Sequence, residues 1–161
     1  MNEHGVYANG TVTGKSSSVS LEHNPYVEDG LLEDVCPLVI CAQASTAREC
    51  IELTAKIINE RGSAEDNIVM IADKTETWYM EIYGGHEYCA IKAPADCVTA
   101  TGNEFQIETI DETHPNVICS STLFTLPAEK GFATYDSNGK MNIFNTYAGH
   151  ETERDTCRLR T

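Results

Sequence analysis

Four β-type segments in close succession constrain the fold of this 161-residue chain more than any other feature of its sequence. They span residues 67–72, 77–83, 86–93 and 96–101. The first is continuously apolar, which is typical of a strand covered on both faces, and the second alternates large aromatic side chains. Short turns, one of them containing Gly84 and Gly85, separate the first three segments. The stretch therefore predicts an antiparallel meander.

A pair of helices is predicted before this meander. Residues 46–61 carry apolar side chains at helical spacing, and Gly62 supplies a stop. Thr46, with Glu49 three residues later, matches a capping box, in which two side chains satisfy N–H groups of the first turn. Residues 31–42 predict a shorter helix that starts or breaks near Pro37. A helical pair on an apolar antiparallel sheet indicates an α+β domain.

The remaining segments give simpler local signals. We expect a strand at residues 6–13, a flexible run at 14–18, a loop at 24–34, a helix near 122–130 and a turn at 136–139. The length is enough for one domain with a sizeable core, so residues 1–161 are expected to form a single domain.

Charge and composition exclude several classes of function. The chain has 25 acidic and 11 basic residues, and a net charge of −14 repels the phosphates of nucleic acids. No apolar run approaches the roughly 18 residues that a membrane span needs. The first residues show no basic region followed by an apolar stretch, so no signal peptide is visible. Neither nucleic-acid binding nor a membrane span is expected.

The cysteines indicate buried thiols rather than a metal site. They are Cys36, Cys41, Cys50, Cys89, Cys97, Cys119 and Cys157. No two of them are spaced as Cys-x-x-Cys, and the five histidines are scattered, so no metal site is predicted. Most lie in apolar surroundings, where cysteine acts as a small hydrophobic residue. Free thiols favour a reducing, cytoplasmic location.

Several short segments resemble, in order along the chain, the motifs of one enzyme family. They are Asn2-Glu3-His4-Gly5-Val6, Pro25-Tyr26-Val27-Glu28-Asp29-Gly30, Ser45-Thr46-Ala47-Arg48-Glu49, the block Trp78-Tyr79-x-Glu81 with Gly84-Gly85-His86, Asn103-Glu104-Phe105-Gln106-Ile107, and Phe144-Asn145-Thr146-Tyr147-Ala148. Together they resemble the C69 dipeptidases, which are N-terminal-nucleophile (Ntn) hydrolases. The resemblance covers nearly the whole chain, and the tryptophan-tyrosine block is its most specific part.

This resemblance implies a fold and a reaction. The fold would be part of an Ntn-hydrolase αββα sandwich, in which two sheets lie between helical layers. The reaction would be hydrolysis of a dipeptide amide bond by a cysteine at the mature N-terminus, whose own α-amine acts as the base. Side-chain amides and an arginine would stabilise the oxyanion, and no cofactor would be needed.

Two site positions carry over from the family. Asn103 corresponds to the asparagine that orients the substrate or binds the oxyanion, although Thr-Gly-Asn-Glu also suits a simple turn. Arg158 or Arg160 corresponds to the arginine near the nucleophile, with a solvated surface charge as the alternative. His86 is expected at a hairpin edge or behind the site. Trp78 and Tyr79 alternate across a strand, so one is expected in the core and the other facing a cleft.

Departures from the family pattern suggest an internal, incomplete piece of such a domain. The family's nucleophilic cysteine lies upstream of the segment at Asn2, and Gly10-Thr11-Val12-Thr13 replaces the usual Ser-Ala-Thr-Glu. We therefore expect an inactive isolated chain that forms a homo-oligomer, aggregates or is only marginally stable, with a dipeptide as the substrate of the complete protein. The alternatives are an amidohydrolase of the choloylglycine or penicillin-amide type and a non-catalytic truncated product.

Overall fold

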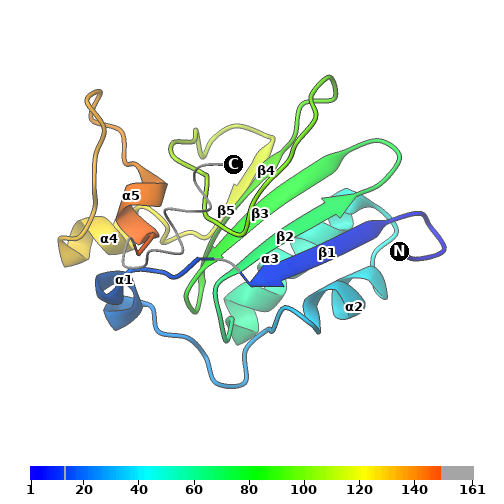
Figure 1. Cartoon of the computed structure of the whole chain (residues 1–161), viewed down its shortest axis with the longest axis horizontal. Helices are drawn as coiled ribbons and strands as arrows, with labels where there is room; N and C mark the ends of the chain where they lie inside the picture. The colour runs from blue at the N-terminus through cyan, green and yellow to red at the C-terminus, as the bar shows by residue number, and fades with distance from the viewer. Residues whose placement is uncertain (13, 150–161) are drawn as a thin grey trace.

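The structure of the chain, a computed structural model, describes residues 1–12 and 14–149. Its centre is an antiparallel sheet in which the strands lie side by side in sequence order (Figure 1). The strands are β1 (Tyr7–Val12), β2 (Asn67–Ala72), β3 (Thr77–Tyr83), β4 (Glu87–Lys92) and β5 (Val117–Cys119). The predicted meander is confirmed in β2, β3 and β4, and the predicted first strand is confirmed as β1.

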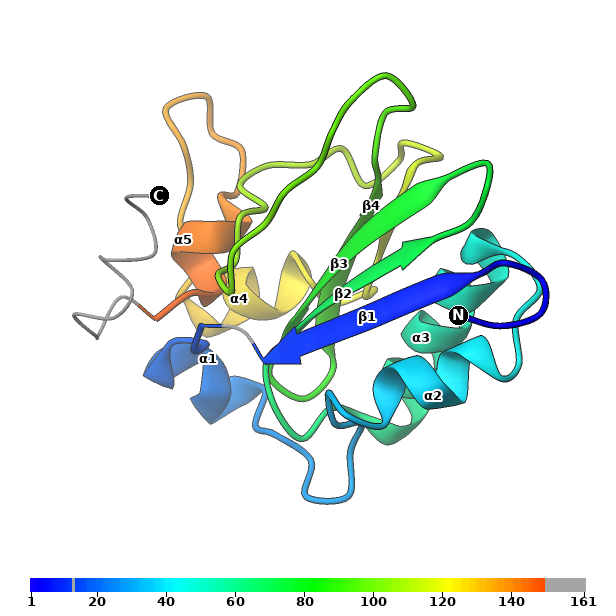
Figure 2. The same cartoon turned by 45° about the vertical axis from the view of Figure 1, so that its right-hand side comes forward.

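Helices lie in two groups around this sheet. They are α1 (Ser18–His23), α2 (Cys36–Cys41), α3 (Ala47–Arg61), α4 (Thr125–Lys130) and α5 (Ile143–Tyr147). Figures 1 and 2 show α2 and α3 along one face of the sheet, while α1, α4 and α5 gather beyond the end where β1 stops. The α+β class, with an antiparallel sheet carrying a helical pair, is confirmed. The part of the chain that is described contains one of the two sheets that a complete αββα sandwich would have.

The two ends of α3 follow the sequence signals. Thr46 is the N-cap, and its hydroxyl accepts a hydrogen bond from the Glu49 backbone N–H over 3.1 Å. The Glu49 carboxylate in turn accepts from the Ser45 N–H over 2.8 Å. Gly62 ends the helix at φ +75°, a conformation that residues with a Cβ rarely adopt. Of the two alternatives for the helix at residues 31–42, the start near Pro37 is confirmed: α2 begins at Cys36, with the proline in its first turn, where a missing N–H is tolerated.

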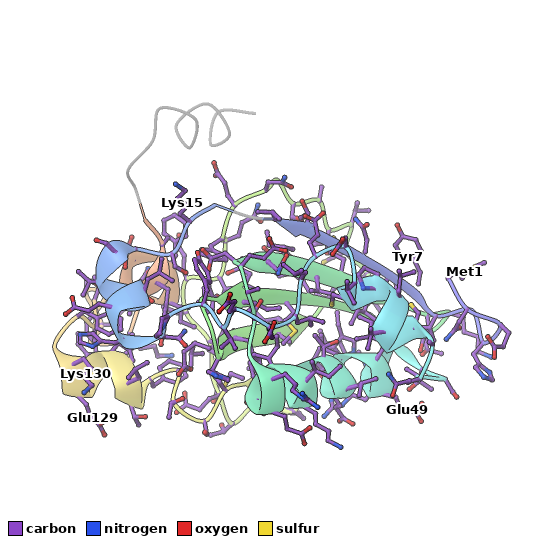
Figure 3. The ribbon with its side chains drawn as sticks, turned by 90° about the horizontal axis from the view of Figure 1, so that it is seen from below. Met1, Tyr7, Lys15, Glu49, Glu129 and Lys130 are labelled. Atoms are coloured by element: carbon purple, nitrogen blue, oxygen red, sulfur yellow. The ribbon has the colours of Figure 1, made fainter. Side chains whose placement is uncertain are left out.

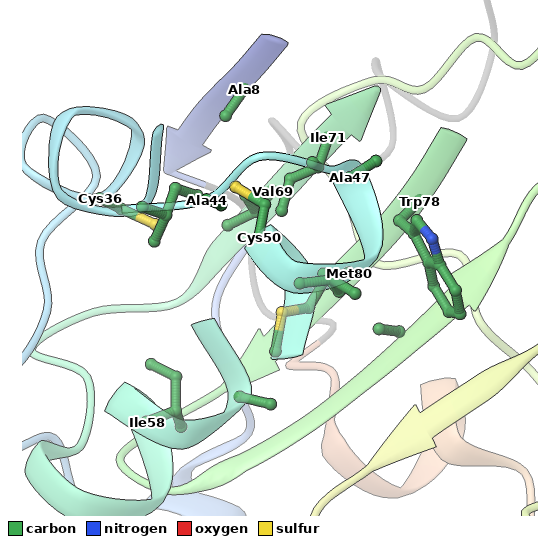
Figure 4. Packing of buried hydrophobic residues seen from close by; sticks show 14 of the residues in the cluster. Ala8, Cys36, Ala44, Ala47, Cys50, Ile58, Val69, Ile71, Trp78 and Met80 are labelled. Carbon is green, nitrogen blue, oxygen red and sulfur yellow. The ribbon is translucent and has the colours of Figure 1, made fainter. Parts of the chain in front are cut away.

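Alternate residues of β3 point to two separate cores. Trp78 and Met80 are fully buried on the side of α2 and α3, as Figure 4 shows. Tyr79 and Tyr83 belong to the opposite face, where the Tyr83 ring lies 4.7 Å from the ring of Phe105. The sequence left open which of Trp78 and Tyr79 faces the core. Both are buried, and Tyr79 also lines a hollow on its own face of the sheet.

The predicted strand at residues 96–101 is wrong. This segment is irregular and mostly exposed, with Val98 98 % exposed, and β5 occupies the place beside β4 instead. The physical reason lies just before it: Ala93 makes the last bond to β3, and Pro94 has no N–H with which to continue the ladder. The sequence did not predict α1, β5 or α5. No helix within the described ranges is long and apolar enough to cross a membrane.

Candidate functional site

Asn103 lies beside the end of β1, where Gly10-Thr11-Val12 departs from the family pattern. The hydroxyl of Thr11 donates to Oδ1 of Asn103 over 2.9 Å, and the Gly14 N–H donates to the Asn103 carbonyl over 3.1 Å. These partners are about 90 residues apart along the chain. Both Thr11 and Asn103 are solvent-accessible. The structure therefore places Asn103, the candidate that carries over from the family, beside Thr11, one of the residues that replace the family's Ser-Ala-Thr-Glu.

The segment of residues 103–107 crosses the second face of the sheet, the face away from α2 and α3. It begins over β1 at Thr11, and its Gln106 and Ile107 N–H groups donate to the Glu81 carboxylate on β3. Between these two points, Phe105 is buried against Tyr83. The segment thus spans from the first strand to the third and leaves the Asn103 end exposed.

Strand register explains this path, because it aligns one residue of each strand in a single row on the second face. The row consists of Thr11, Ile68, Glu81, Cys89 and Cys119. Thr11 and Glu81, which bond to the two ends of the segment, therefore occupy the same row. This alignment follows from antiparallel pairing, in which directly opposed residues share a face.

Glu81 is the most enclosed acidic group of this face, with no exposed surface. Its carboxylate accepts from the Tyr79 hydroxyl at 2.5 Å, from the Tyr83 hydroxyl at 2.7 Å and from the Gln106 N–H at 2.5 Å. Burial raises the pKa of Glu81, because the charged form loses its hydration, while these donors oppose the rise.

Two hollows adjoin the loop of residues 93–101, and the first of them also touches the crossing segment. One, of about 470 Å³, lies between residues 91–101 and 106–109 and is lined by Tyr79, Ile91 and Gln106. The other, of about 510 Å³, lies against the β2–β3 turn, where the Lys92 ammonium is 2.6 Å from the Glu76 carboxylate. Both volumes are in the range of small-molecule sites.

The other candidate residues lie elsewhere. Arg158 and Arg160 lie outside the described residues. His86 is at the start of the β4 hairpin arm, where Nδ1 is 2.8 Å from the Ile58 carbonyl at the end of α3. Asn2 binds the link between α2 and α3, with its amide donating to the Cys41 and Ala44 carbonyls at 2.8 and 2.7 Å. Figure 3 shows Met1 and Tyr7 toward the end of the molecule where β1 begins, and Lys15 beyond the other end of that strand.

The cysteines of the described ranges are free thiols, and most are buried or half-buried. Burial raises the pKa of Cys36 and of Cys50 to about 12, and it raises the pKa of Cys89 and Cys119 as well. These groups stay protonated at neutral pH and are poor nucleophiles. No group of three or more metal-binding side chains occurs between residues 1 and 149, position 13 aside.

Comparison with known proteins identifies the family. A sequence model described as peptidase family C69 matches residues 1–159. The chain belongs to peptidase family C69. It is 39 % identical over 147 residues to a probable dipeptidase B from Streptococcus pyogenes serotype M1, covering 91 % of this chain and 29 % of that protein. It is 36 % identical to a probable dipeptidase from Latilactobacillus sakei, over 72 % of this chain and 24 % of the relative.

A third relative has the same description. The chain is 30 % identical over 158 residues to a probable dipeptidase from Salmonella dublin, covering 96 % of this C69 chain and 36 % of that protein. This C69 chain spans about 29 % of the length of the Streptococcus pyogenes relative.

Sequence reasoning missed a second buried carboxylate that joins C69 motifs. Asp66, which is 3 % exposed, accepts from the Tyr26 hydroxyl at 2.6 Å and the Gly84 N–H at 2.7 Å. The Ser16 hydroxyl and N–H complete its partners, at 2.7 and 2.6 Å. Tyr26 and Gly84 each belong to a recognised motif of the C69 resemblance, but nothing local in the sequence marked Asp66 as their common partner.

Proposed function

We propose that this chain forms one wall of a dipeptide-hydrolysing site in a C69 dipeptidase. The observation that carries the proposal is the position of Asn103, which is exposed beside Thr11 and held by a segment whose other end is bonded to buried Glu81. Dipeptides are the proposed substrates because the compared C69 relatives are named as probable dipeptidases.

The proposed chemistry uses a cysteine thiolate at a chain terminus, which attacks the carbonyl carbon after giving its proton to its own α-amine. Charge develops on the carbonyl oxygen, where positioned N–H groups stabilise it. Because Thr11 donates to the amide oxygen of Asn103, the amide nitrogen is the atom that donates to this oxyanion. In this proposal the positive charge of the site comes from Arg158 or Arg160, the two positions that correspond to the family arginine. Collapse expels the second amino acid as its amine, which takes the proton held by the α-ammonium group, and water then hydrolyses the thioester.

None of the seven cysteines of this chain is the proposed nucleophile. Each lies inside the sequence, without an adjacent free α-amine. Cys36 and Cys50 also have a pKa of about 12, so they lack the thiolate that attack requires. In the proposal, the nucleophile comes from a longer protein, and the isolated chain does not hydrolyse peptides.

A hydrolysis assay tests whether the nucleophile comes from outside this chain. The purified chain is incubated with a panel of dipeptides and, in parallel, with conjugated bile acids and penicillin-type amides. No turnover is expected from the chain, whereas dipeptide turnover is expected from the product of the reading frame extended to include the sequence before Met1. Turnover by the chain with every cysteine replaced by serine would contradict the proposed mechanism. Hydrolysis of the acyl amides in preference to dipeptides would favour the choloylglycine-type alternative.

Asn103→Ala in the extended protein provides the residue-level test. Loss of one oxyanion donor lowers kcat by about 100-fold or more, with a smaller change in KM. Asn138→Ala, in an exposed turn, is the matched control and should leave both constants unchanged. Full activity of the Asn103→Ala enzyme would remove Asn103 from the mechanism.

A further inference from the structure

The Trp-Tyr-x-Glu block is the most specific part of the family resemblance, yet the reaction proposed above gives its glutamate no role. Glu81 is fully buried, and none of the ion pairs in the described part of the chain includes it. A buried carboxylate without a cation is costly unless hydrogen bonds satisfy it. The positions of its hydrogen-bond donors therefore indicate its role.

Its donors come from two places. Tyr79 and Tyr83 lie two residues to either side on the same strand and each donates its hydroxyl. The remaining donors are the Gln106 and Ile107 N–H groups of the crossing segment, at 2.5 Å and 3.3 Å from Oε1. The tyrosines fix the carboxylate oxygens from the side of β3. The backbone N–H groups bond to the same oxygens from the side of the crossing segment.

We propose that Glu81 is a positioning residue for the site: its carboxylate holds the backbone at Gln106 and Ile107, and so keeps Asn103 beside Thr11. The value of this placement for hydrolysis rests on the proposed function, in which Asn103 acts on the substrate. The placement itself rests only on contacts within this chain.

The geometry of the crossing segment connects the Glu81 contacts to the position of Asn103. Asn103 is only three residues from Gln106, so fixing the latter limits how far the Asn103 amide can move. Phe105, between them, packs edge-on against Tyr83, whose hydroxyl is one of the Glu81 donors. Glu81 and Thr11 also share a row of the sheet, so the two attachment points are held at a fixed spacing by strand pairing.

An ionised carboxylate suits this role better than a neutral group. It offers only acceptors, and all four partners can donate at once. A glutamine of the same shape would turn an NH₂ group toward one pair of donors and keep one acceptor oxygen. A leucine would offer no acceptor and would leave the buried Ile107 N–H and the part-buried Gln106 N–H without this partner.

Amide hydrogen exchange on the ¹⁵N-labelled chain tests the proposal residue by residue. In Glu81→Leu, exchange at Gln106 and Ile107 should accelerate by about 10-fold or more relative to the β2 amides, because local opening costs less. Exchange at Gly14, whose N–H bonds to the Asn103 carbonyl, should accelerate too. In Glu81→Gln the acceleration at Gln106 and Ile107 should be about 3-fold, since one neutral acceptor remains.

Glu87 offers a matched control on the same face. It is 2 % exposed and accepts from the Ser120 and Thr122 hydroxyls, with no bond to the crossing segment. Glu87→Leu and Glu87→Gln should leave Gln106, Ile107 and Gly14 at their original rates relative to β2. If Glu81→Leu fails to fold, the exchange rates at Gln106 and Ile107 in Glu81→Gln and Glu87→Gln are sufficient to test the proposal.

Two results would overturn the inference: unchanged relative exchange at Gln106 and Ile107 in Glu81→Gln, or equal acceleration in the Glu87 variants. Hydrolysis by the extended protein separates this inference from the proposed function. If Asn103→Ala keeps full activity while the exchange pattern appears, Glu81 positions the segment but the proposed function fails. If Asn103→Ala is inactive and exchange is unchanged, the function stands and the Glu81 inference fails.

Discussion

At the scale of single residues, carboxylates bonded to neutral donors connect distant parts of this chain. Asp66 and Glu81 do so in the interior, and Asp73 does so at the β2–β3 turn. Asp73 accepts from the Ala47 N–H in the first turn of α3 at 2.8 Å and from the Thr75 hydroxyl and N–H at 2.6 and 2.7 Å. One acidic side chain thus ties a turn of the sheet to the positive end of the helix that covers it.

Asp73→Ala is expected to lower the free energy of unfolding by about 1–2 kcal/mol at pH 7, in the range of lost helix caps. Desolvation acts to raise the pKa of Asp73, but the Ala47 and Thr75 donors outweigh it and lower the pKa well below its usual value. A lowered folded-state pKa gives stability that is present above the unfolded pKa, near ~3.9, and is lost as pH falls through the folded value.

Urea denaturation at neutral and acidic pH measures this effect. The stability difference between the original chain and Asp73→Ala should shrink as pH falls below about 4. Asp73→Asn keeps one acceptor and should lie between the two. A difference that is the same at both pH values would show that the Asp73 charge does not contribute.

At the scale of elements, α3 and β5 show how local and distant signals differ. Both caps of α3 were read from adjacent residues and were confirmed. The strand beside β4 was placed at residues 96–101, but β5, more than fifteen residues later, fills that position. Residues 96–101 and 117–119 both have β-type composition, and Pro94, which has no N–H to continue the ladder, lies just before the first of them.

Gly62→Ala tests the end of α3. The glycine has φ +75°, and a Cβ there would lie 2.4 Å from Cγ2 of Val27 and 3.1 Å from Cε1 of His86. Conformational strain and this clash together should cost about 2–4 kcal/mol. Gly139→Ala is the control, because it has φ +76° but open space around the new Cβ, and should cost about 1 kcal/mol. Equal destabilisation of the two variants, by thermal or urea unfolding, would mean that the clash is relieved.

At the scale of the whole molecule, apolar side chains on one side remain accessible to solvent. Leu38 is 73 % exposed, and Leu32 and Val35 are each about two-fifths exposed around the start of α2. The adjacent strand β1 forms one edge of the described sheet, and its Tyr7 is 51 % exposed. Exposed apolar residues beside a sheet edge favour association with other chains.

We therefore predict that the isolated chain self-associates at micromolar concentration. Sedimentation velocity across a concentration series should show dimers or larger species. Leu38→Lys should shift the distribution toward monomer, whereas Val98→Lys, at an even more exposed residue on the distant 96–101 segment, should not. A sample that stays monomeric and melts cooperatively across the series would contradict this prediction.

The sequence by itself determined the meander of β2 to β4, α3 with its caps and the C69 family, because periodicity, capping and motifs are properties of neighbouring residues. It singled out Asn103 as a candidate, and its catalytic role remains a prediction. Only the tertiary structure decided that Asn103 meets Thr11, 92 residues away, and that Glu81 bonds to Gln106, 25 residues away. Those contacts depend on the pairing of β1 with β2 and on where residues 103–107 cross the sheet, and both join segments that are far apart in the sequence.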